Sequence, residues 1–313
     1  MNAVSVKNVF KTYEKGSVSA LDNVSLEIAK GELFGLIGPD GAGKTSLFRI
    51  LTTLLLPDMG SASLLGYDTV KDYREIRNRV GYMPGKFSLY QDLSVAENLA
   101  FFATLFNTTI EENYDLVKDI YEQIKPFSDR RAGKLSGGMK QKLALCCALI
   151  HKPEVLLLDE PTTGVDVVSR KEFWDMLKRL KEQGITILVS TPYMDEAVLC
   201  ERIALIQSGK ILSVDTPQEI IKQYPVKLFA ARAGNIYKLL SSLRANPAIE
   251  SSYAFGEYLH VTLKEKGSGL QSLQKIASDS GITDTELKEI EPTIEDSFIR
   301  LMNQTQLTPA VNG

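Results

Sequence analysis

The sequence predicts an α/β protein in which a nucleotide-binding domain is followed by a smaller α+β domain. Three observations support this prediction. A glycine-rich loop, Gly38–Thr45, lies between a strand pattern and a helical pattern. A second apolar run, Val155–Leu158, ends in two consecutive carboxylates. Near Tyr224-Pro225 the hydrophobic pattern of the sequence changes. From there on, short strand patterns and short helix patterns follow one another.

Composition limits the function classes that need consideration. The chain has 313 residues, of which 44% are hydrophobic and 24% charged, as in ordinary soluble globular proteins. Its net charge of −3 shows no basic excess, so we expect no nucleic-acid partner. No stretch approaches the roughly 20 apolar residues that cross a bilayer, and the first residues do not resemble a secretory signal. We therefore expect a cytoplasmic protein.

The elements of the first domain follow from hydrophobic periodicity. Alternating residues predict strands over Val4–Phe10 and Leu21–Ile28, and an apolar run predicts a strand within Gly31–Gly38. A helix is expected over Lys44–Leu55. The later elements are helices over Ser94–Ile124, Gly137–Ile150 and Val168–Lys181, strands over Val155–Leu158 and Ile185–Ser190, and a hairpin of Arg202–Gln207 with Ile211–Val214.

The remainder of the chain predicts a βαββαβ order, which is ferredoxin-like in kind. Its expected elements are strands over Lys227–Ala231, Ile249–Tyr253, Glu257–Leu263 and Glu286–Glu291, and helices over Asn235–Arg244, Leu270–Ser280 and Thr293–Met302. We place the first domain at residues 1–224, the accessory domain at 225–305 and a tail at 306–313, of which Thr308–Gly313 is expected to be frayed.

The glycine-rich loop fits the phosphate-binding pattern G-x-x-x-x-G-K-[ST]. Glycines let backbone N–H groups point at phosphate oxygens, and the helix that follows adds its positive end. Lys44 can reach the β- and γ-phosphates, and the Thr45 hydroxyl can bind Mg²⁺. The predicted nucleotide-binding residues of this segment are Gly38, Pro39, Asp40, Gly41, Ala42, Gly43, Lys44, Thr45 and Ser46.

The two carboxylates that end the second apolar run have separate predicted roles. Asp159 closes a buried strand and can deliver its carboxylate to the Mg²⁺ shell. Glu160 follows directly and can polarise an attacking water. Lys44 and Glu160 are therefore the candidate catalytic residues, and Thr45 and Asp159 are the candidate metal ligands.

The segment Leu135-Ser-Gly-Gly-Met-Lys-Gln141 narrows the prediction. Together with the phosphate loop and Leu158-Asp-Glu-Pro161, it makes residues 1–220 resemble the ATP-binding-cassette (ABC) ATPases. The resemblance implies a P-loop NTPase cassette with a RecA-like core, an antiparallel β subdomain and a helical subdomain at about 86–150. It also implies ATP and Mg²⁺ as ligands.

In that family two cassettes pair head to tail, and each ATP lies between one phosphate loop and the other subunit's serine–glycine segment. The resemblance therefore implies a dimer, in which Ser136, Gly137, Gly138 and Gln141 contact nucleotide. By the same resemblance, Tyr13 fits the aromatic residue that stacks on adenine. Asp166 fits the acidic residue that links the two sites.

The sequence departs from the family pattern at two positions. Gly85 stands where the family has a glutamine that helps to hold Mg²⁺ and water, and Pro192 stands where it has a histidine that contacts the γ-phosphate. Proline offers no donor and glycine no side chain. We hypothesise that the chain binds MgATP well, hydrolyses it poorly at its own loop, and favours a heterodimer over a homodimer.

The leading functional prediction is the ATPase subunit of an ABC exporter, on the cytoplasmic face of the cell membrane and docked on a transmembrane permease. The Leu135–Gln141 and Tyr193–Ala197 segments resemble cassettes of drug-efflux and ABC-2-like systems. Two alternatives are a regulatory cassette with little turnover and a non-transport cassette acting on ribosomes or DNA. A GTPase is disfavoured because no N-K-x-D segment is present. The transported substrate is not encoded in this chain.

Overall fold

The computed structural model describes residues 2–265 and 269–307. The chain divides into two compact units, one comprising the residues up to Gln218 with the end of the last helix, the other Glu219–Asn303. Of the tail expected at 306–313, Gln306 and Leu307 belong to the last helix, and Thr308–Gly313 lie outside the described residues. In the part of the chain that is described, no helix is long and apolar enough to cross a membrane.

The first unit begins with an antiparallel sheet in the order β2-β1-β4-β5. Along β1 the side chains of Ala3, Val4, Val6 and Val9 are buried. Val4 and Val6 follow the predicted alternation, and a register shift against β2 between Val6 and Val9 interrupts it. The strands are β1 (Asn2–Tyr13), β2 (Val18–Ala29), β4 (Met59–Leu64) and β5 (Tyr67–Asp68), with a 3₁₀ turn η1 at Glu14–Gly16.

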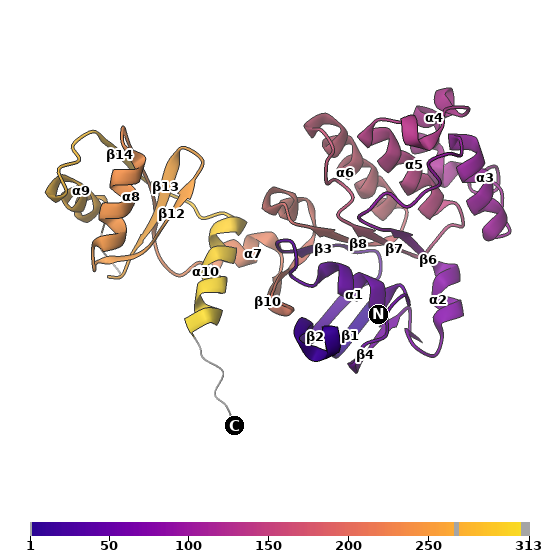
Figure 1. The fold of residues 1–313 in the computed structure, drawn as a ribbon, viewed down its shortest axis with the longest axis horizontal. Helices are drawn as coiled ribbons and strands as arrows, with labels where there is room; N and C mark the ends of the chain where they lie inside the picture. Colours follow the sequence, from indigo (N-terminus) through magenta and orange to yellow (C-terminus); the bar gives the residue numbers. More distant parts are fainter. Residues whose placement is uncertain (1, 266–268, 308–313) are drawn as a thin grey trace. The chain divides into compact units, whose positions relative to one another are not determined.

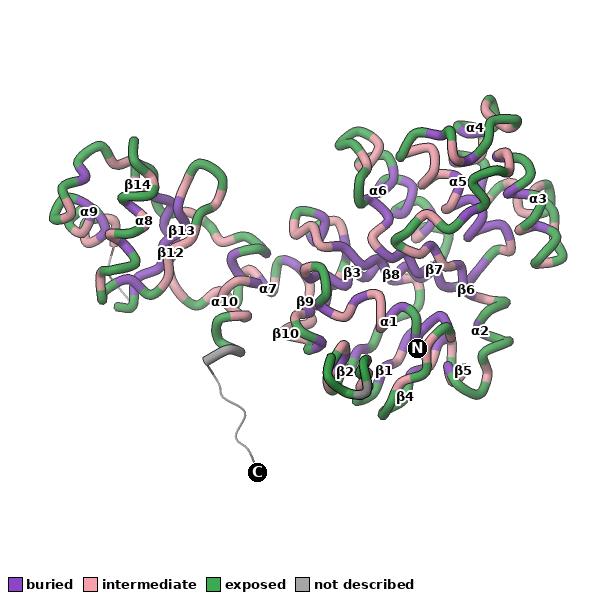
Figure 2. Tube along the Cα trace, viewed as in Figure 1, coloured by how far each residue is buried: buried purple, intermediate pink, exposed green. Residues whose placement is uncertain are grey.

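A six-stranded sheet forms the centre of this unit, in the order β10-β9-β3-β8-β7-β6. All neighbours are parallel except β10, which pairs antiparallel with β9. Every residue of β3, β7 and β8 is buried, as expected for a parallel sheet that is covered on both faces. Figure 2 shows these strands as a buried band. The strands are β3 (Leu33–Ile37), β6 (Val80–Met83), β7 (Val155–Asp159), β8 (Thr186–Thr191), β9 (Arg202–Gln207) and β10 (Lys210–Asp215).

Helices cover the two faces of this sheet, α1 on one and α5 and α6 on the other (Figure 1). The helices are α1 (Lys44–Leu51), α2 (Tyr73–Arg79), α3 (Val95–Leu105), α4 (Tyr114–Ile124), α5 (Gly137–Leu149), α6 (Val167–Glu182) and α7 (Pro217–Lys222), with 3₁₀ turns η2 (Lys125–Phe127), η3 (Ala132–Lys134) and η4 (Met194–Leu199).

Two helix predictions need correction. The helix expected over Lys44–Leu55 ends at Leu51, because Thr53 has a φ of 63° and leaves the right-handed helical region. The helical stretch expected over Ser94–Ile124 is two helices, α3 and α4, separated near Asn107, whose φ is 52°. A capping box of Ser94 and Glu97 begins α3.

The second unit confirms the predicted βαββαβ order. Its antiparallel sheet has the order β12-β13-β11-β14, so β13 lies between β11 and β12 in the split βαβ arrangement of ferredoxin-like folds. Buried apolar residues of α8 and α9, such as Leu239 and Leu273, pack on this sheet. The elements are β11 (Leu228–Ala233), α8 (Ile236–Ala245), β12 (Ile249–Phe255), β13 (Tyr258–Leu263), α9 (Leu270–Asp279), β14 (Thr285–Ile290) and α10 (Ile294–Leu307).

Candidate nucleotide-binding site

The phosphate loop connects the carboxyl end of β3 to the first turn of α1. Gly41 and Gly43 have φ values of 76° and 107°, which favour glycine. A Cβ atom on Gly43 would lie 2.3 Å from the carbonyl oxygen of Ala20, and one on Gly38 would lie 2.1 Å from that of Ile206. The loop is therefore packed directly on neighbouring backbone and tolerates no side chain at these two positions.

Lys44 lies at the centre of this loop with only 3% of its surface exposed. Its Nζ donates hydrogen bonds to the carbonyl oxygens of Gly38 and Pro39, at 2.7 and 2.9 Å. The same Nζ lies 3.1 Å from Oε1 of Glu160. The two predicted catalytic residues are thus an ion pair, formed where the phosphate loop faces the end of β7.

The two predicted metal ligands also meet. The Thr45 hydroxyl donates a 2.8 Å hydrogen bond to Oδ2 of Asp159, and Ser190 donates a 2.5 Å hydrogen bond to Oδ1 of the same carboxylate. Asp159 is 2% exposed, so its position is fixed. Hydroxyl and carboxylate oxygens are hard donors of the kind that Mg²⁺ takes alongside phosphate and water, so this donor set fits the ion. Ser190 was not predicted, because nothing in the strand pattern around it indicates a site.

Glu160 has a backbone conformation that is uncommon for a residue with a side chain. Its φ is 51°, and its N–H donates to the carbonyl oxygen of Ser190 at 3.0 Å. Such a conformation costs of the order of 1 kcal/mol and persists where the surroundings impose it. Here the chain turns immediately after Asp159. The two consecutive carboxylates therefore contact different residues: Asp159 accepts a hydrogen bond from Thr45, and Glu160 pairs with Lys44.

Both positions that depart from the family pattern lie at this edge of the sheet. A Cβ atom on Gly85 would lie 3.1 Å from the carbonyl oxygen of Asp159 and 3.8 Å from its Oδ2. Pro192 directly follows β8, whose last residue, Thr191, accepts a 3.2 Å hydrogen bond from the N–H of Gly38. A side chain at either position would begin beside the predicted site, and neither residue supplies a polar group there.

Tyr13 lies at the end of β1, and its hydroxyl is 3.2 Å from the hydroxyl of Ser46. This contact brings the predicted adenine-stacking residue to the first turn of α1, beside the phosphate loop. Asp40 is exposed, whereas Ala42 is buried.

The predicted serine–glycine segment begins α5 on a different part of the first unit. Ser136 caps the helix, its hydroxyl accepting a 3.4 Å hydrogen bond from the N–H of Met139, and Ser136 and Gly137 are exposed. Gly138 packs against Ser169, whose hydroxyl would be 2.7 Å from an added Cβ, and Gln141 is half-buried.

Asp166 caps the adjacent helix α6. Its carboxylate accepts a 3.0 Å hydrogen bond from the N–H of Ser169. The hydrogen bonds from Ser169 lower the pKa of the Asp166 carboxyl group. The candidate dimer residues Ser136 and Asp166 therefore begin two neighbouring helices, and both hold backbone amides by side-chain capping.

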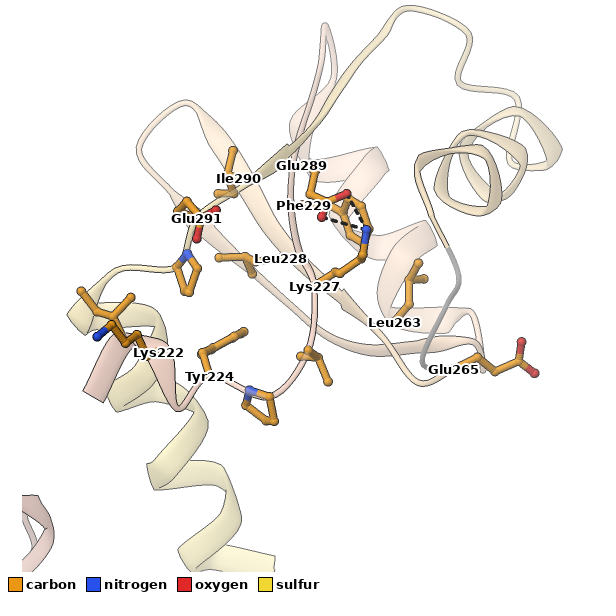
Figure 3. Close-up of a pocket in the computed structure, with 14 residues that line it drawn as sticks. Lys222, Tyr224, Lys227, Leu228, Phe229, Leu263, Glu265, Glu289, Ile290 and Glu291 are labelled. Atoms are coloured by element: carbon orange, nitrogen blue, oxygen red, sulfur yellow. Dashed lines mark hydrogen bonds and ion pairs between the residues drawn. The ribbon is translucent and has the colours of Figure 1, made fainter. Parts of the chain in front are cut away.

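The second unit has a pocket of its own, of about 570 Å³, which contains none of the predicted site residues. Figure 3 shows its apolar lining, with Leu228 and Phe229 from β11 and Ile290 from β14. Its charged groups include Lys227 and Glu289, which form an ion pair of 2.9 Å.

A family model described as ABC transporter matches residues 21–163 of the chain. The chain is 39% identical over 298 residues to the probable multidrug ABC transporter ATP-binding protein YbhF of Escherichia coli, covering 94% of this chain and 50% of YbhF. It therefore spans about half the length of that curated relative. It is 32% identical over 303 residues to Nod factor export ATP-binding protein I of Rhizobium sp., covering 96% of each.

Solved structures agree with these sequence matches. The chain resembles cbiO1 from Clostridium perfringens, part of an ABC transporter complex, with a TM-score of 0.62 and 25% identity over 71% of this chain and 91% of the other. The ATP-binding cassette MJ0796, solved as a dimer bound to ADP and Pi, matches with a TM-score of 0.62 and 28% identity over 68% of this chain and 98% of that one. The predicted fold class is confirmed.

Proposed function

The chain belongs to the ABC transporter family, and from that premise we propose that it is the ATP-binding and ATP-hydrolysing subunit of a membrane exporter. One observation carries the proposal: Lys44 with Glu160, and Thr45 with Asp159, meet at the edge of the sheet where the phosphate loop begins. The names of YbhF and Nod factor export protein I, which refer to multidrug transport and to export, favour an exporter.

Different residues of the chain are proposed to bind the adenine, the phosphates and the Mg²⁺ ion of MgATP. Tyr13 stacks on adenine, and the amides of the loop Gly38–Ser46 hold the phosphates at the start of α1. Thr45 and Asp159 would hold Mg²⁺, which would neutralise phosphate charge.

Hydrolysis requires the Lys44–Glu160 ion pair to open. In the structure the Lys44 ammonium neutralises Glu160. A bound triphosphate offers Lys44 a more highly charged partner, so we expect Nζ to turn to the β- and γ-phosphates. The Glu160 carboxylate is then free to accept a proton from the attacking water.

Turnover at this site is expected to be slow. Gly85 and Pro192 leave the edge beside Asp159 without the two polar side chains that the family pattern supplies there. One missing transition-state donor typically costs about 10²–10³ in rate. The phosphate loop with Lys44 and Thr45, and Asp159, are all retained, so the chain is expected to bind MgATP well.

The second nucleotide site of the dimer uses the serine–glycine segment, Ser136, Gly137, Gly138 and Gln141, facing another cassette's phosphate loop. Exposure supports this assignment: Val167 and Val168, next to Asp166, are 80% and 69% exposed, an apolar surface that a second cassette would cover. We favour a heterodimer, in which this chain completes the partner's competent site. The greater length of YbhF leaves room for a second cassette-sized part.

The permease is expected to dock on the cytoplasmic side at an apolar groove of about 430 Å³. Pro84, next to Gly85, lines this groove with Met83, Phe102 and Phe106. Leu54, which also lines it, is 59% exposed, so it offers apolar area to a partner. A helix end of the permease would bury this surface and contact the segment that carries Gly85.

Affinity purification from gently solubilised membranes tests the proposal. We expect the tagged chain to bring down a permease and a second cassette, and the complex to hydrolyse ATP. Recovery with ribosomes or DNA alone would contradict it. Glu160→Gln should lower the slow phosphate release from this chain's own site in single-turnover measurements, whereas the exposed Glu172→Gln should not.

Gly85 and Pro192 also favour one second candidate, a regulatory cassette that binds ATP and does not turn it over. Single-turnover measurements on the assembled complex separate the two, because any release of phosphate that depends on Glu160 excludes a purely regulatory site.

A further inference from the structure

A buried carboxylate lies behind the candidate catalytic edge and belongs to none of the predicted motifs. Glu196, in η4, is 1% exposed. Its Oε1 accepts a 2.7 Å hydrogen bond from the hydroxyl of Thr162, and its Oε2 accepts one of 2.6 Å from the hydroxyl of Thr191. Arg170 provides the counter-charge, with its Nε 3.6 Å from Oε1.

Thr162 lies in the turn after β7, and Thr191 is the last residue of β8. Thr162 is the second residue after Glu160, and Thr191 immediately precedes Pro192. The carbonyl oxygen of Thr191 accepts the N–H of Gly38 at 3.2 Å, so the same residue also contacts the phosphate loop. One carboxylate thus joins the turn after β7 to the turn after β8, and through Thr191 to the loop after β3.

Both oxygens of the Glu196 carboxylate accept a hydrogen bond, which gives the carboxylate a defined geometry, whereas Nε of Arg170 is buried and its contact with Oε1 is an ion pair rather than a hydrogen bond. The Thr191 hydroxyl also accepts a 3.1 Å hydrogen bond from the N–H of Tyr193, and the guanidinium of Arg170 lies 4.3 Å from the centre of the Tyr193 ring. Hydrogen bonds from hydroxyls to a carboxylate are short and about twice as strong as neutral ones. A buried ion pair nonetheless adds little to the free energy of unfolding, because the cost of desolvating the charges offsets much of their attraction.

We propose that Glu196 is a positioning residue for ATP hydrolysis, holding the Glu160 turn and the Thr191–Pro192 turn at the separation that the reaction needs. This inference rests on the proposed ATPase function. Glu196 does not touch Lys44 or Thr45, the groups assigned to binding. Its loss should therefore slow the chemical step and leave nucleotide affinity nearly unchanged.

The test uses the assembled complex in single-turnover experiments, with the complex in excess of radiolabelled ATP and Mg²⁺. The partner cassette carries a glutamine in place of its own catalytic glutamate, so that phosphate release reports on this chain's site. Sampling is long enough to resolve a slow site. Glu196→Gln replaces one of the two acceptor oxygens by a donor. We expect hydrolysis to slow by about 10–100-fold, as for displacement of a catalytic group. MgATP affinity, measured with a fluorescent analogue, should change less than about twofold, since no Lys44 or Thr45 contact is lost.

Matched variants separate positioning from folding. Thr162→Val removes the hydroxyl at nearly constant shape and should slow hydrolysis, whereas Thr162→Ser keeps the hydroxyl and should restore it. Asp175→Asn changes an exposed carboxylate of α6 and should have no effect. An unchanged rate in both Glu196→Gln and Thr162→Val would overturn the inference. Equal losses of rate and affinity, tracking a lower melting temperature, would also overturn it, because they indicate a structural role.

Failure of the underlying function gives a different result. If wild type and Glu160→Gln release phosphate equally, the site is not an ATPase and both proposals fall. If wild type is faster than Glu160→Gln but equal to Glu196→Gln, only the positioning role is refuted.

Discussion

The hydroxyl of Thr45 donates a 2.8 Å hydrogen bond to Oδ2 of Asp159, although 114 residues separate them in sequence. Thr45 is in the first turn of α1 and Asp159 ends β7. The sheet places β8 between β3 and β7, so residues at the carboxyl ends of these parallel strands share one edge. Ser190, at the end of β8, completes the contact by holding the other oxygen of the carboxylate.

This contact predicts how Asp159→Asn affects nucleotide binding. An amide keeps one acceptor but loses the charge, so affinity for MgATP should fall about 10–100-fold, the equivalent of ~1.5–3 kcal/mol for a charged interaction. Affinity for ATP in EDTA should change little, because Asp159 acts with the ion. Titration of a fluorescent ATP analogue in both buffers measures this. The exposed Asp119→Asn serves as the control, and equal weakening in both buffers would contradict the assignment.

The Lys44–Glu160 ion pair predicts that substitutions of its two residues have opposite effects on ATP binding. Glu160→Gln releases Lys44 from a 3.1 Å carboxylate contact, so ATP should bind as tightly as in wild type or more tightly. Single-turnover hydrolysis should fall by about 10²-fold or more, because the proton acceptor is lost. Lys44→Ala should weaken ATP binding itself. Weak binding by Glu160→Gln would show that Glu160 does not compete with nucleotide, and tight binding by Lys44→Ala would show that Lys44 does not hold the phosphates.

Local sequence was enough to predict the elements that carry the phosphate loop. The run Gly31–Gly38 and the G-x-x-x-x-G-K-[ST] pattern depend on neighbouring residues, and they appear as β3, the loop and α1. The βαββαβ order was also predictable, because each short element has its own periodicity. The break between α3 and α4 near Asn107 was not predicted. Apolar residues continue on both sides of it, and the positive φ of Asn107 does not change the hydrophobic spacing.

Contacts between distant segments were not predictable in the same way. Ser190 and Glu196 lie in a strand and in a 3₁₀ turn, without a local motif, and they acquire roles only when β7 and β8 become neighbours. The left-handed φ of Glu160 is likewise imposed by the turn that follows the buried strand. The strands β4, β5 and β6 are short and partly exposed or glycine-containing, so their patterns are weak.

The departures at Gly85 and Pro192 predict variants with a gain of activity. Pro192→His should raise single-turnover hydrolysis by about 10²-fold by restoring a donor beside the phosphates. Gly85→Gln should act in the same direction less strongly, because its Cβ lies 3.1 Å from the Asp159 carbonyl oxygen and the turn must shift slightly. The double variant should gain less than the product of the two.

Alanine variants supply the controls for this gain. Pro192→Ala frees the backbone without adding a donor, and Gly85→Ala adds a Cβ without an amide. Neither should exceed the wild-type rate by more than about twofold, since no transition-state contact is added. If Pro192→Ala and Pro192→His raise the rate of hydrolysis equally, the slow rate of the wild-type site is caused by backbone rigidity at Pro192 and not by the missing side chain.

His151 predicts a loss of stability of the first unit in mild acid. Its ring stacks on Phe106 with 3.9 Å between the ring centres, and its Nε2 lies 3.2 Å from the carbonyl oxygen of Val80. Burial lowers the pKa of His151 to about 4, although the hydrogen bond with Val80 acts in the opposite direction. In the unfolded chain the ordinary value of 6.5 applies, so between pH 6.5 and 4 the unfolded state binds the extra proton. Stability is therefore full above pH 6.5 and falls as the pH decreases towards 4.

Urea unfolding at pH 7.5 and at pH 5 measures this loss. The single tryptophan, Trp174, is buried in α6, so its fluorescence reports on the first unit. The free energy of unfolding of the wild-type chain should fall by about 2 kcal/mol more than that of His151→Phe over this interval. Phenylalanine keeps a ring against Phe106 but cannot titrate. The variant therefore loses the contribution of His151 to the pH dependence, together with the hydrogen bond to Val80. Parallel pH dependence in the two proteins would place the acid sensitivity in carboxylates elsewhere in the unit.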